Sequence, residues 1–275
     1  MNFKNTVFFS GMAVFLSFLI LNSVTYHAAF AATEYEHKTK WGEKGVAIGQ
    51  FNQVGGITAD SENNIYVGDF TGRSNMIQKF TENGSFILGF GVLGNGPQFF
   101  TNPSGLAADS ENNIYIADFG NPNYAIKKFS SDGNFIDAFG SFGLGDGQFI
   151  TPGGIGVDKE NNIYATDFGE NNNVQKFDQN GNFLMKFGSQ GTGDGQFDNP
   201  FELAIDSSDN IFVIDNNNNR VQIFNNNGEY ISQFGNQGPI ADRLEDPITI
   251  AIDSSDNVYV GDGKDTDIHV YSPVK

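Results

Sequence analysis

The chain has 275 residues, a formal net charge of −18 at pH 7, 34 glycines, 28 phenylalanines and no cysteine. This charge disfavours nucleic acid and anionic membrane surfaces as partners, because both require clustered Lys and Arg. The lack of cysteine excludes disulfides and thiolate chemistry, while the length suffices for one large all-β domain.

The first 31 residues have the layout of a secretory signal peptide. Lys4 precedes an apolar run of 15 residues, Val7–Leu21, and Ala29-Phe30-Ala31 fits a cleavage site. An uncleaved membrane anchor is the alternative, although the run is shorter than the ~20 residues that a spanning helix needs. We expect a signal peptide over 1–31 and an exported domain over 32–275, secreted or at the extracellular surface, with no stable membrane insertion after cleavage.

The remainder of the chain repeats itself with a step of 47 to 49 residues. Each repeat carries two aspartates that flank an aromatic residue. The first aspartates are Asp60, Asp109, Asp158, Asp206 and Asp253, and the second are Asp69, Asp118, Asp167, Asp215 and Asp262. A fixed step of this length is typical of repeat folds.

Four strands are expected in each repeat, as the third one illustrates. They cover Gly154–Asp158, Ile163–Asp167, Val174–Phe177 and Asn182–Phe187, which we name strands a to d. Polar turns separate them, and the Asn-Gly pair before strand d supplies the positive φ angles of a tight hairpin. Four antiparallel strands per repeat predict the blade of a β-propeller.

The two ends of the chain suggest how the ring closes. The last repeat has strands a to c but stops at Lys275 without strand d, whereas Glu34–Trp41 resembles a strand d without its blade. Pairing of this N-terminal strand with the C-terminal blade would complete five four-stranded blades and remove exposed edges. Five blades is our expectation, and six is the alternative.

Several motifs carry a resemblance to a known family. Gly-x-Gly-x-Gly-Gln-Phe at Gly143–Phe149, Asn-Ile-Tyr-x-x-Asp at Asn162–Asp167 and Val-Gln-x-Phe at Val174–Phe177 look like NHL repeats, as does Arg220 with its neighbours. The resemblance implies a β-propeller but no single activity, because NHL propellers include protein-binding, RNA-binding and sensor domains as well as enzymes. Repeats one to three lack the arginine found at Arg220, and relatives more often have six blades.

Candidate site residues lie where the loops of one face converge. Asp118, Asp167 and Asp215 end their strands b on the face that the d–a and b–c loops share, and they could bind Ca²⁺ through carboxylate oxygens. Their repetition favours a structural role in each turn instead. A Ca²⁺ ion is therefore a possible cofactor, and the main expectation is that the protein needs none.

Departures from the repeat are more informative. Glu202 and Thr249 stand where the first three repeats have Gly56, Gly105 and Gly154. A carboxylate on the channel wall would be a candidate ligand or proton-transfer group, and a solvated rim position is an equal alternative. We expect Glu202, Asp167, Asp215 and Thr249 to bind ligand, and Glu202, Asp118, Asp167 and Asp215 to hold any metal.

Histidine chemistry is restricted because only His37 and His269 follow the signal segment, both in strands at the ring's periphery. A Ser/His/Asp triad is therefore disfavoured. The sequence favours a monomeric, non-enzymatic propeller that binds a protein or glycan partner through its loop face. The alternative is an extracellular cation-dependent lyase or lactonase-type hydrolase with its site at the channel mouth.

Overall fold

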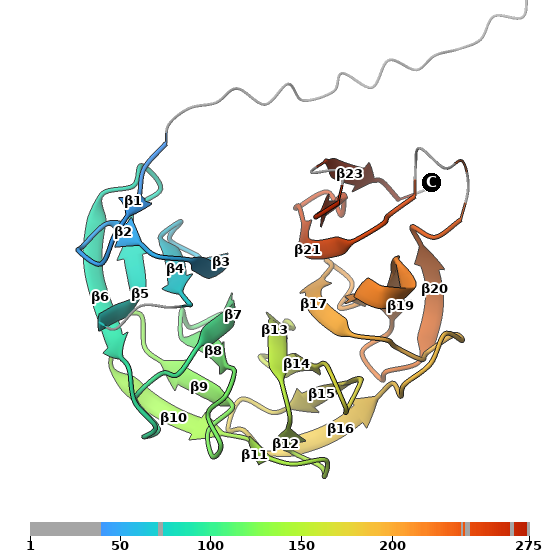
Figure 1. Cartoon of the computed structure of the whole chain (residues 1–275), viewed down its shortest axis with the longest axis horizontal. Coiled ribbons are helices and arrows are strands. Elements are labelled where there is room, and N and C mark those ends of the chain that lie inside the picture. The colour runs from blue at the N-terminus through green and yellow to red at the C-terminus, as the bar shows by residue number, and fades with distance from the viewer. Residues whose placement is uncertain (1–39, 71–73, 238, 240–242, 265–266, 274–275) are drawn as a thin grey trace, which may run out of the picture. The chain divides into compact units, whose positions relative to one another are not determined.

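The computed structural model describes residues 40–70, 74–237, 239, 243–264 and 267–273 (Figure 1). The signal peptide expected over 1–31 lies outside the described residues and stays a prediction. No helix among the described residues is long and apolar enough to cross a membrane.

Each repeat forms one antiparallel sheet whose strands pair in chain order, so the predicted blades are confirmed. Four sheets have four strands and the last has three. The strands are β3 (Val54–Ala59), β4 (Ile65–Asp69), β5 (Ser74–Phe80) and β6 (Phe86–Val92) in blade 1; β7 (Pro103–Ala108), β8 (Ile114–Asp118), β9 (Ile126–Phe129) and β10 (Phe135–Phe139) in blade 2; β13 (Pro152–Val157), β14 (Ile163–Asp167), β15 (Asn173–Phe177) and β16 (Phe183–Phe187) in blade 3; β17 (Pro200–Ile205), β18 (Ile211–Asp215), β19 (Arg220–Phe224) and β20 (Tyr230–Phe234) in blade 4; and β21 (Pro247–Ile252), β22 (Val258–Asp262) and β23 (Ile268–Tyr271) in blade 5.

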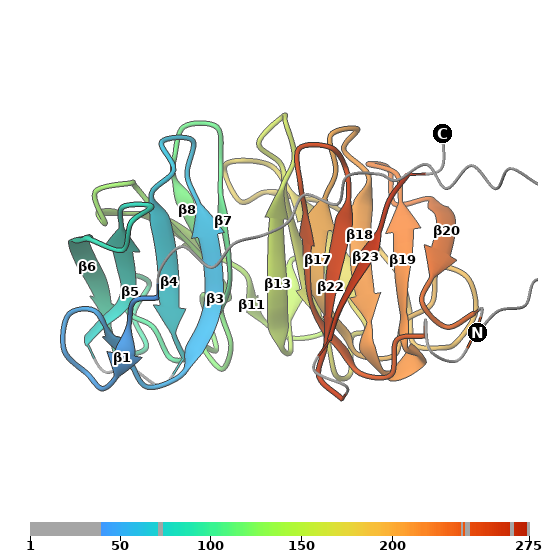
Figure 2. The same cartoon turned by 90° about the horizontal axis from the view of Figure 1, so that it is seen from above.

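The blades stand side by side, with the loops between strands gathered at two opposite ends (Figures 1 and 2). The first strands of successive blades pack on one another, from β3 to β7, β13, β17 and β21. Glycine is required where these strands approach closely, because a Cβ on Gly56 would lie 2.1 Å from the carbonyl oxygen of Ser104. The glycines of the repeat therefore serve the packing of neighbouring inner strands.

The glycine-rich d–a loops contain structure that the sequence did not predict. β1 (Glu43–Lys44) pairs in parallel with β2 (Gln50–Phe51), and β11 (Ser141–Phe142) pairs with β12 (Gln148–Phe149). A 3-10 turn, η1 (Asn216–Asn218), follows β18 and is the single helical segment among the described residues. In the second parallel pair the side chain of Gln148 accepts a hydrogen bond from the N–H of Gly145.

A phenylalanine at the end of the third strand in blades 1 to 4 organises the core between blades. Phe177 lies between Phe139 and Phe149, with ring centroids 5.0 and 5.7 Å apart, and each comes from a different strand or loop. Phe129 and Phe224 are enclosed in the same manner. Burial of these large rings provides the main apolar stabilisation of a fold without disulfides.

Among the described residues, blades 1 and 5 each have one exposed apolar face. Ile57 on β3 is 64% exposed, whereas its equivalents Leu106, Ile155 and Leu203 are at most 7% exposed because the preceding blade covers them. On β23, Ile268 is 63% exposed while the equivalent Val221 is fully buried. Within the described ranges, no packing like that between successive inner strands joins β3 to β21.

The N-terminal closing strand predicted over Glu34–Trp41 lies outside the described residues except for Lys40 and Trp41. The closure of a five-bladed ring thus stays a prediction, and blade 5 has three strands in the part of the chain that is described. Trp41 stacks on Phe80 of blade 1, with ring centroids 4.5 Å apart, as Phe187 stacks on Phe224. This equivalence places Trp41 where a strand d ends.

Candidate functional site

The aspartates that end the second strands are buried, and they hold the preceding loop against their own blade through hydrogen bonds. Each accepts backbone N–H bonds from the loop that leads into its own blade. The donors are Asn52 and Gln53 for Asp69, Thr101 and Asn102 for Asp118, Ile150 and Thr151 for Asp167, Asp198 for Asp215, and Glu245 and Asp246 for Asp262. A carboxylate satisfied in this way fixes the loop that precedes its sheet.

The other series of aspartates shapes the hairpins between the first and second strands. Oδ1 of Asp158 accepts the N–H groups of Glu160 and Asn162, and the hydroxyl of Tyr164 donates to Oδ2 at 3.3 Å. Burial and the Asp158 carboxylate both raise the pKa of Tyr164 well above its ordinary value. These side chains build a turn of the kind that short polar residues favour.

The residues expected to share a cation do not converge in the structure. Glu202 lies on an inner strand, whereas Asp118, Asp167 and Asp215 each face their own d–a loop. No group of three or more His, Cys, Asp or Glu side chains that could hold a metal occurs in the described part of the chain. Ca²⁺ binding stays a prediction.

Glu202 is half-buried and directed at the neighbouring blade. Its carboxyl group receives hydrogen bonds from the hydroxyl of Thr249 and from the N–H of Ile250, both on β21. Burial raises the pKa of Glu202, and these two bonds oppose the shift. The structure thus brings together two predicted site residues, Glu202 and Thr249, in the seam between blades 4 and 5.

Aromatic side chains form a row across blades 2 to 4. Phe119 lies 6.4 Å from Phe168, and Phe168 lies 5.5 Å from Phe201, between ring centroids. Phe119 and Phe168 follow the aspartates that end β8 and β14, and Phe201 is the second residue of β17. We call these three residues the aromatic row; its last ring is 40% exposed. The row was not predicted from the sequence, although Asp-Phe pairs in the first three repeats indicate it.

Blade 2 departs from its sisters in the third strand. Gln78, Gln175 and Gln222 occupy equivalent positions in three blades, and each binds the preceding d–a loop through its amide. Lys127 replaces the glutamine in blade 2; it is fully buried and lies 2.5 Å from Oδ2 of Asp118. Burial lowers the pKa of Lys127, and Asp118 opposes that shift. The sequence shows Lys127 in place of this glutamine, but the ion pair with Asp118 was not predicted from it.

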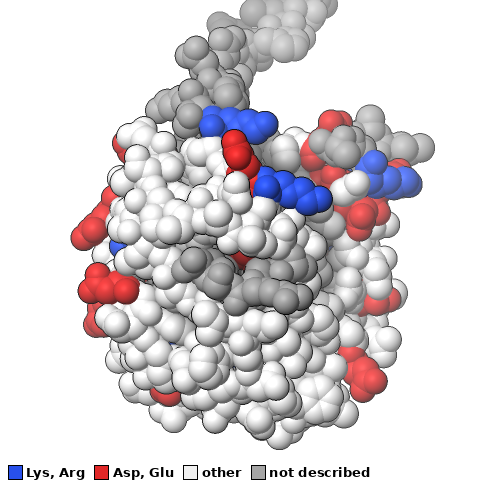
Figure 3. Space-filling view, turned by 60° about the vertical axis from the view of Figure 1, so that its left-hand side comes forward, with Lys and Arg blue, Asp and Glu red and all other residues white. Residues whose placement is uncertain are grey.

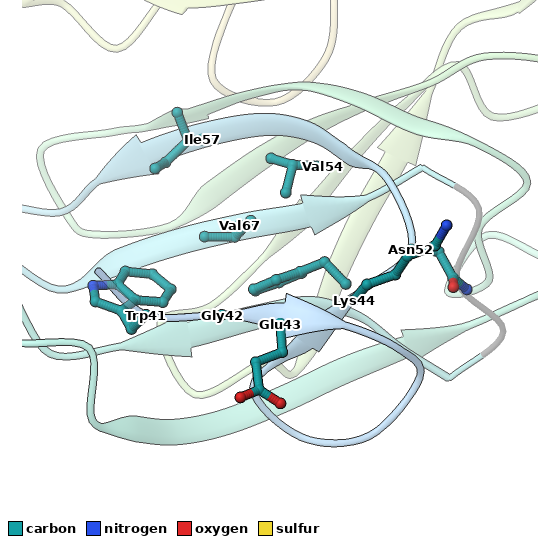
Figure 4. A pocket seen from close by; sticks show the side chains of 9 residues that line it. Trp41, Gly42, Glu43, Lys44, Asn52, Val54, Ile57 and Val67 are labelled. Atoms are coloured by element: carbon teal, nitrogen blue, oxygen red, sulfur yellow. The ribbon is translucent and has the colours of Figure 1, made fainter.

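Two cavities open beside these elements. One of about 520 Å³ lies on the uncovered face of blade 1, where Val54, Ile57 and Val67 line it together with Trp41 (Figure 4). The other, of about 380 Å³, lies between the b–c loop of blade 2 and the d–a loop of blade 3. On the face shown in Figure 3, most of the basic side chains lie along the upper edge with acidic ones beside them, and the other acidic side chains lie apart from one another among uncharged residues.

Family models match two parts of the chain. An NHL repeat model matches residues 100–129, and a model described as a 6-bladed beta-propeller matches residues 207–273. The chain is a β-propeller that carries an NHL repeat, as its sequence motifs indicated. Five blades of this propeller are described, and the second model's description agrees with the six-bladed alternative. No curated protein matches the propeller in sequence.

Solved structures share the fold of this propeller at low sequence identity. Virginiamycin B lyase from Staphylococcus aureus, bound to quinupristin, is 16% identical, with a TM-score of 0.56 over 80% of this chain and 69% of that one. A protein of unknown function from Bacteroides caccae is 14% identical, with a TM-score of 0.57 over 76% and 71%. A gluconolactonase from Xanthomonas campestris is 12% identical, with a TM-score of 0.57 over 76% and 69%. At these identities the likeness is one of fold alone.

Proposed function

We propose that this propeller is a non-enzymatic binding domain, secreted or held at the extracellular surface, which binds a protein or glycan partner through its loop face. The observation that carries the proposal is the aromatic row. Aromatic rings that remain partly exposed offer large contact areas to sugar faces and to apolar side chains. The buried aspartates of the same loops are occupied by backbone N–H groups and so hold the loops in place.

The net charge of the protein restricts the class of partner that it can bind. With a net charge of −18, the surface favours partners that carry basic groups and disfavours acidic ones such as nucleic acids. Such long-range attraction acts mainly on the association rate and weakens as salt is added. We therefore expect binding to be faster at low ionic strength.

A binding screen tests this proposal. Purified protein would be presented to a glycan array and to a displayed peptide library, and the best binder would be measured with two variants. Phe201→Ala is expected to weaken binding by at least about tenfold, as for truncation of an interface aromatic residue. Ile231→Ala is the matched control, because Ile231 is similarly exposed but lies on the outer strand β20. Equal binding by wild type and Phe201→Ala, or no binder in either screen, contradicts the proposal.

A cation-dependent lyase or lactonase-type hydrolase is the second candidate. Glu202 supports it, because a carboxyl group with a raised pKa on an inner strand suits proton transfer. Metal analysis and thermal unfolding with and without Ca²⁺ distinguish the two functions. Stabilisation by Ca²⁺ that disappears in Glu202→Gln favours the enzyme.

A further inference from the structure

Blade 4 departs from blade 3 at two neighbouring positions of the loop face. In blade 3 the residue after the inner-strand proline is Gly153, and a Cβ on it would lie 3.1 Å from Cδ1 of Phe168, which follows the second aspartate. Blade 4 has Phe201 and Asn216 at these two positions. Phe201 therefore lies beside an amide of its own blade, while its ring is 5.5 Å from that of Phe168 in blade 3.

The side chain of Asn216 joins blade 4 to blade 5. Its Nδ2 donates to Oδ1 of Asp246 at 2.8 Å and to the carbonyl oxygen of Pro247 at 2.9 Å. Its Oδ1 accepts a hydrogen bond from Nδ2 of Asn199 at 3.1 Å. Both donors of the Asn216 amide are thus in use. The amide holds the Asp246 side chain in place and has no donor left for a ligand.

Asp246 offers one carboxylate oxygen to a ligand. It is exposed, and its Oδ2 accepts no hydrogen bond from the residues that the structure describes. Gly263 leaves the space around this oxygen clear, because a Cβ there would lie 2.8 Å from Oδ2. Uncharged residues stand before the inner strand in the other blades, namely Gln53, Asn102, Thr151 and Asn199. Asp246 is therefore the single carboxylate of this series.

Exposed apolar side chains accompany this carboxylate in the seam between blades 4 and 5. Phe201 is 40% exposed and Ile248 is 42% exposed, and each is the second residue of its inner strand. The two strands, β17 and β21, pack on each other. Lys264 from the next loop pairs with Glu245, so its cation is engaged beside Asp246. The seam thus combines an apolar surface with a free anionic acceptor.

The polar groups of the seam restrict the class of ligand. The hydroxyl groups of a sugar both donate and accept, but the donors of Asn216 are already in use and an ionised Asp246 can only accept. A guanidinium group only donates, stacks on aromatic rings and pairs with carboxylates. The net charge of −18 also favours a basic ligand. These properties select an arginine side chain.

We propose that the seam between blades 4 and 5 binds an arginine side chain of a peptide partner, with its guanidinium group stacked on Phe201 and donating to Oδ2 of Asp246. Ile248 contacts the aliphatic part of that side chain, as apolar surfaces do with the stems of long basic residues. The inference rests on the proposed binding function and selects a peptide over a glycan at this position.

The test is a titration of the purified ¹⁵N-labelled protein with N-acetylarginine methylamide, followed by NMR. We expect saturable shifts of the Asn216 side-chain amide and of the Ile248 and Gly263 backbone signals, and weaker binding as salt is added. N-acetylcitrulline methylamide, which has the same shape without the charge, is expected to bind about fivefold more weakly. Equal binding of the two probes, or no saturable shift with the arginine probe, overturns the inference.

Methyl glucoside is the probe for the glycan alternative. It is expected to leave the signals of Asn216, Ile248 and Gly263 unchanged, because the seam offers it acceptors without matching donors. Shifts produced by the glucoside alone overturn the inference.

Two variants assign the contacts. Asp246→Asn keeps the oxygen that accepts from Asn216 but removes the charge, and it is expected to weaken binding of the arginine probe about fivefold. Asp137→Asn is the matched control, because it changes the net charge equally at an exposed position of the outer strand β10. Phe201→Leu keeps an apolar side chain without the ring and should weaken binding about threefold. Unchanged binding by Asp246→Asn, or an equal loss in Asp137→Asn, overturns the inference.

The outcomes separate this inference from the proposed function. If Phe201→Ala weakens partner binding while Asp246→Asn does not, the loop face binds a partner but the seam does not take an arginine. If the screen yields only glycans whose binding depends on Phe201, the function stands and the arginine assignment fails. If the arginine probe binds as expected but neither screen yields a binder, the seam assignment stands and the proposed function fails.

Discussion

Blades 2 and 3 differ in the polar contacts around the aspartate that ends the second strand, although both are built from the same repeat. In blade 3, Asn171 donates to Asp167, and Gln175 binds the loop that precedes the blade. In blade 2, the ammonium group of Lys127 forms an ion pair with the equivalent aspartate, Asp118. In blade 3 the side-chain amides of Asn171 and Gln175 make these contacts, whereas in blade 2 the buried Nδ2 of Asn121 has no hydrogen-bond partner.

This difference shows how the polar contacts of a repeat can change while its architecture is kept. The aromatic packing of Phe129 and Phe177 is the same in the two blades, so the replacement of glutamine by Lys127 does not change the apolar core. Only the polar contacts of the loops change. A functional position in such a protein is therefore to be sought where the polar series of the repeat is broken.

Removal of Lys127 is the change with the largest expected effect on this comparison. Lys127→Met leaves Asp118 buried without its cation and should lower the free energy of unfolding by about 3–5 kcal/mol. Urea unfolding followed by circular dichroism measures this loss. The double variant Asp118→Asn with Lys127→Met is expected to lose less, because no charge remains unpaired. A single variant as stable as wild type would show that the pair does not support blade 2.

An intermediate effect is expected in blade 3. Asn171→Ala removes the side chain that donates to Asp167 and to the carbonyl oxygen of Gly143, and should cost about 1–3 kcal/mol. Asn218→Ala is the matched change in blade 4, where Asp215 keeps bonds from Arg220 and Gln222. We expect the loss at Asn218 to be the smaller of the two in the same unfolding assay. A larger loss at Asn218 would mean that Arg220 does not compensate.

The sequence is sufficient to predict the blades because their signals are local and repeated. Strand length, Asn-Gly or Asp-Gly turns, and the returning Asp-x-Glu-Asn-Asn or Asp-Ser-Ser-Asp-Asn segments predict the sheets, and the strands lie close to where they were expected. The direction of Glu202 was not predictable, because it depends on how closely β17 approaches β21. The short parallel pairs in the d–a loops depend on the same long-range packing. Asn121 was missed because no local sequence pattern shows that its buried Nδ2 has no hydrogen-bond partner.

The smallest effect concerns the seam between blades 4 and 5, where Glu202 replaces the glycine of the first three repeats. Burial raises the pKa of its carboxyl group above the ordinary value of 4.5. The neutral form is therefore favoured in the folded state, so stability that is present below about pH 4.5 is lost as the pH rises through the folded-state pKa. Glu202→Gln stays neutral and should unfold at a higher temperature than wild type at pH 7.5.

The same variant separates burial from hydrogen bonding in this seam. At pH 4 the two proteins should differ little, since wild-type Glu202 is then largely protonated. The gain at pH 7.5 is expected to stay within about 1 kcal/mol, as for most substitutions outside the core. Thermal unfolding at both pH values measures this gain in stability. Thr249→Val is the control, because it removes the hydroxyl donor to Glu202. A wild type more stable than Glu202→Gln at pH 7.5 would mean that the bonds from Thr249 and Ile250 outweigh burial, and that the seam favours the charged carboxylate.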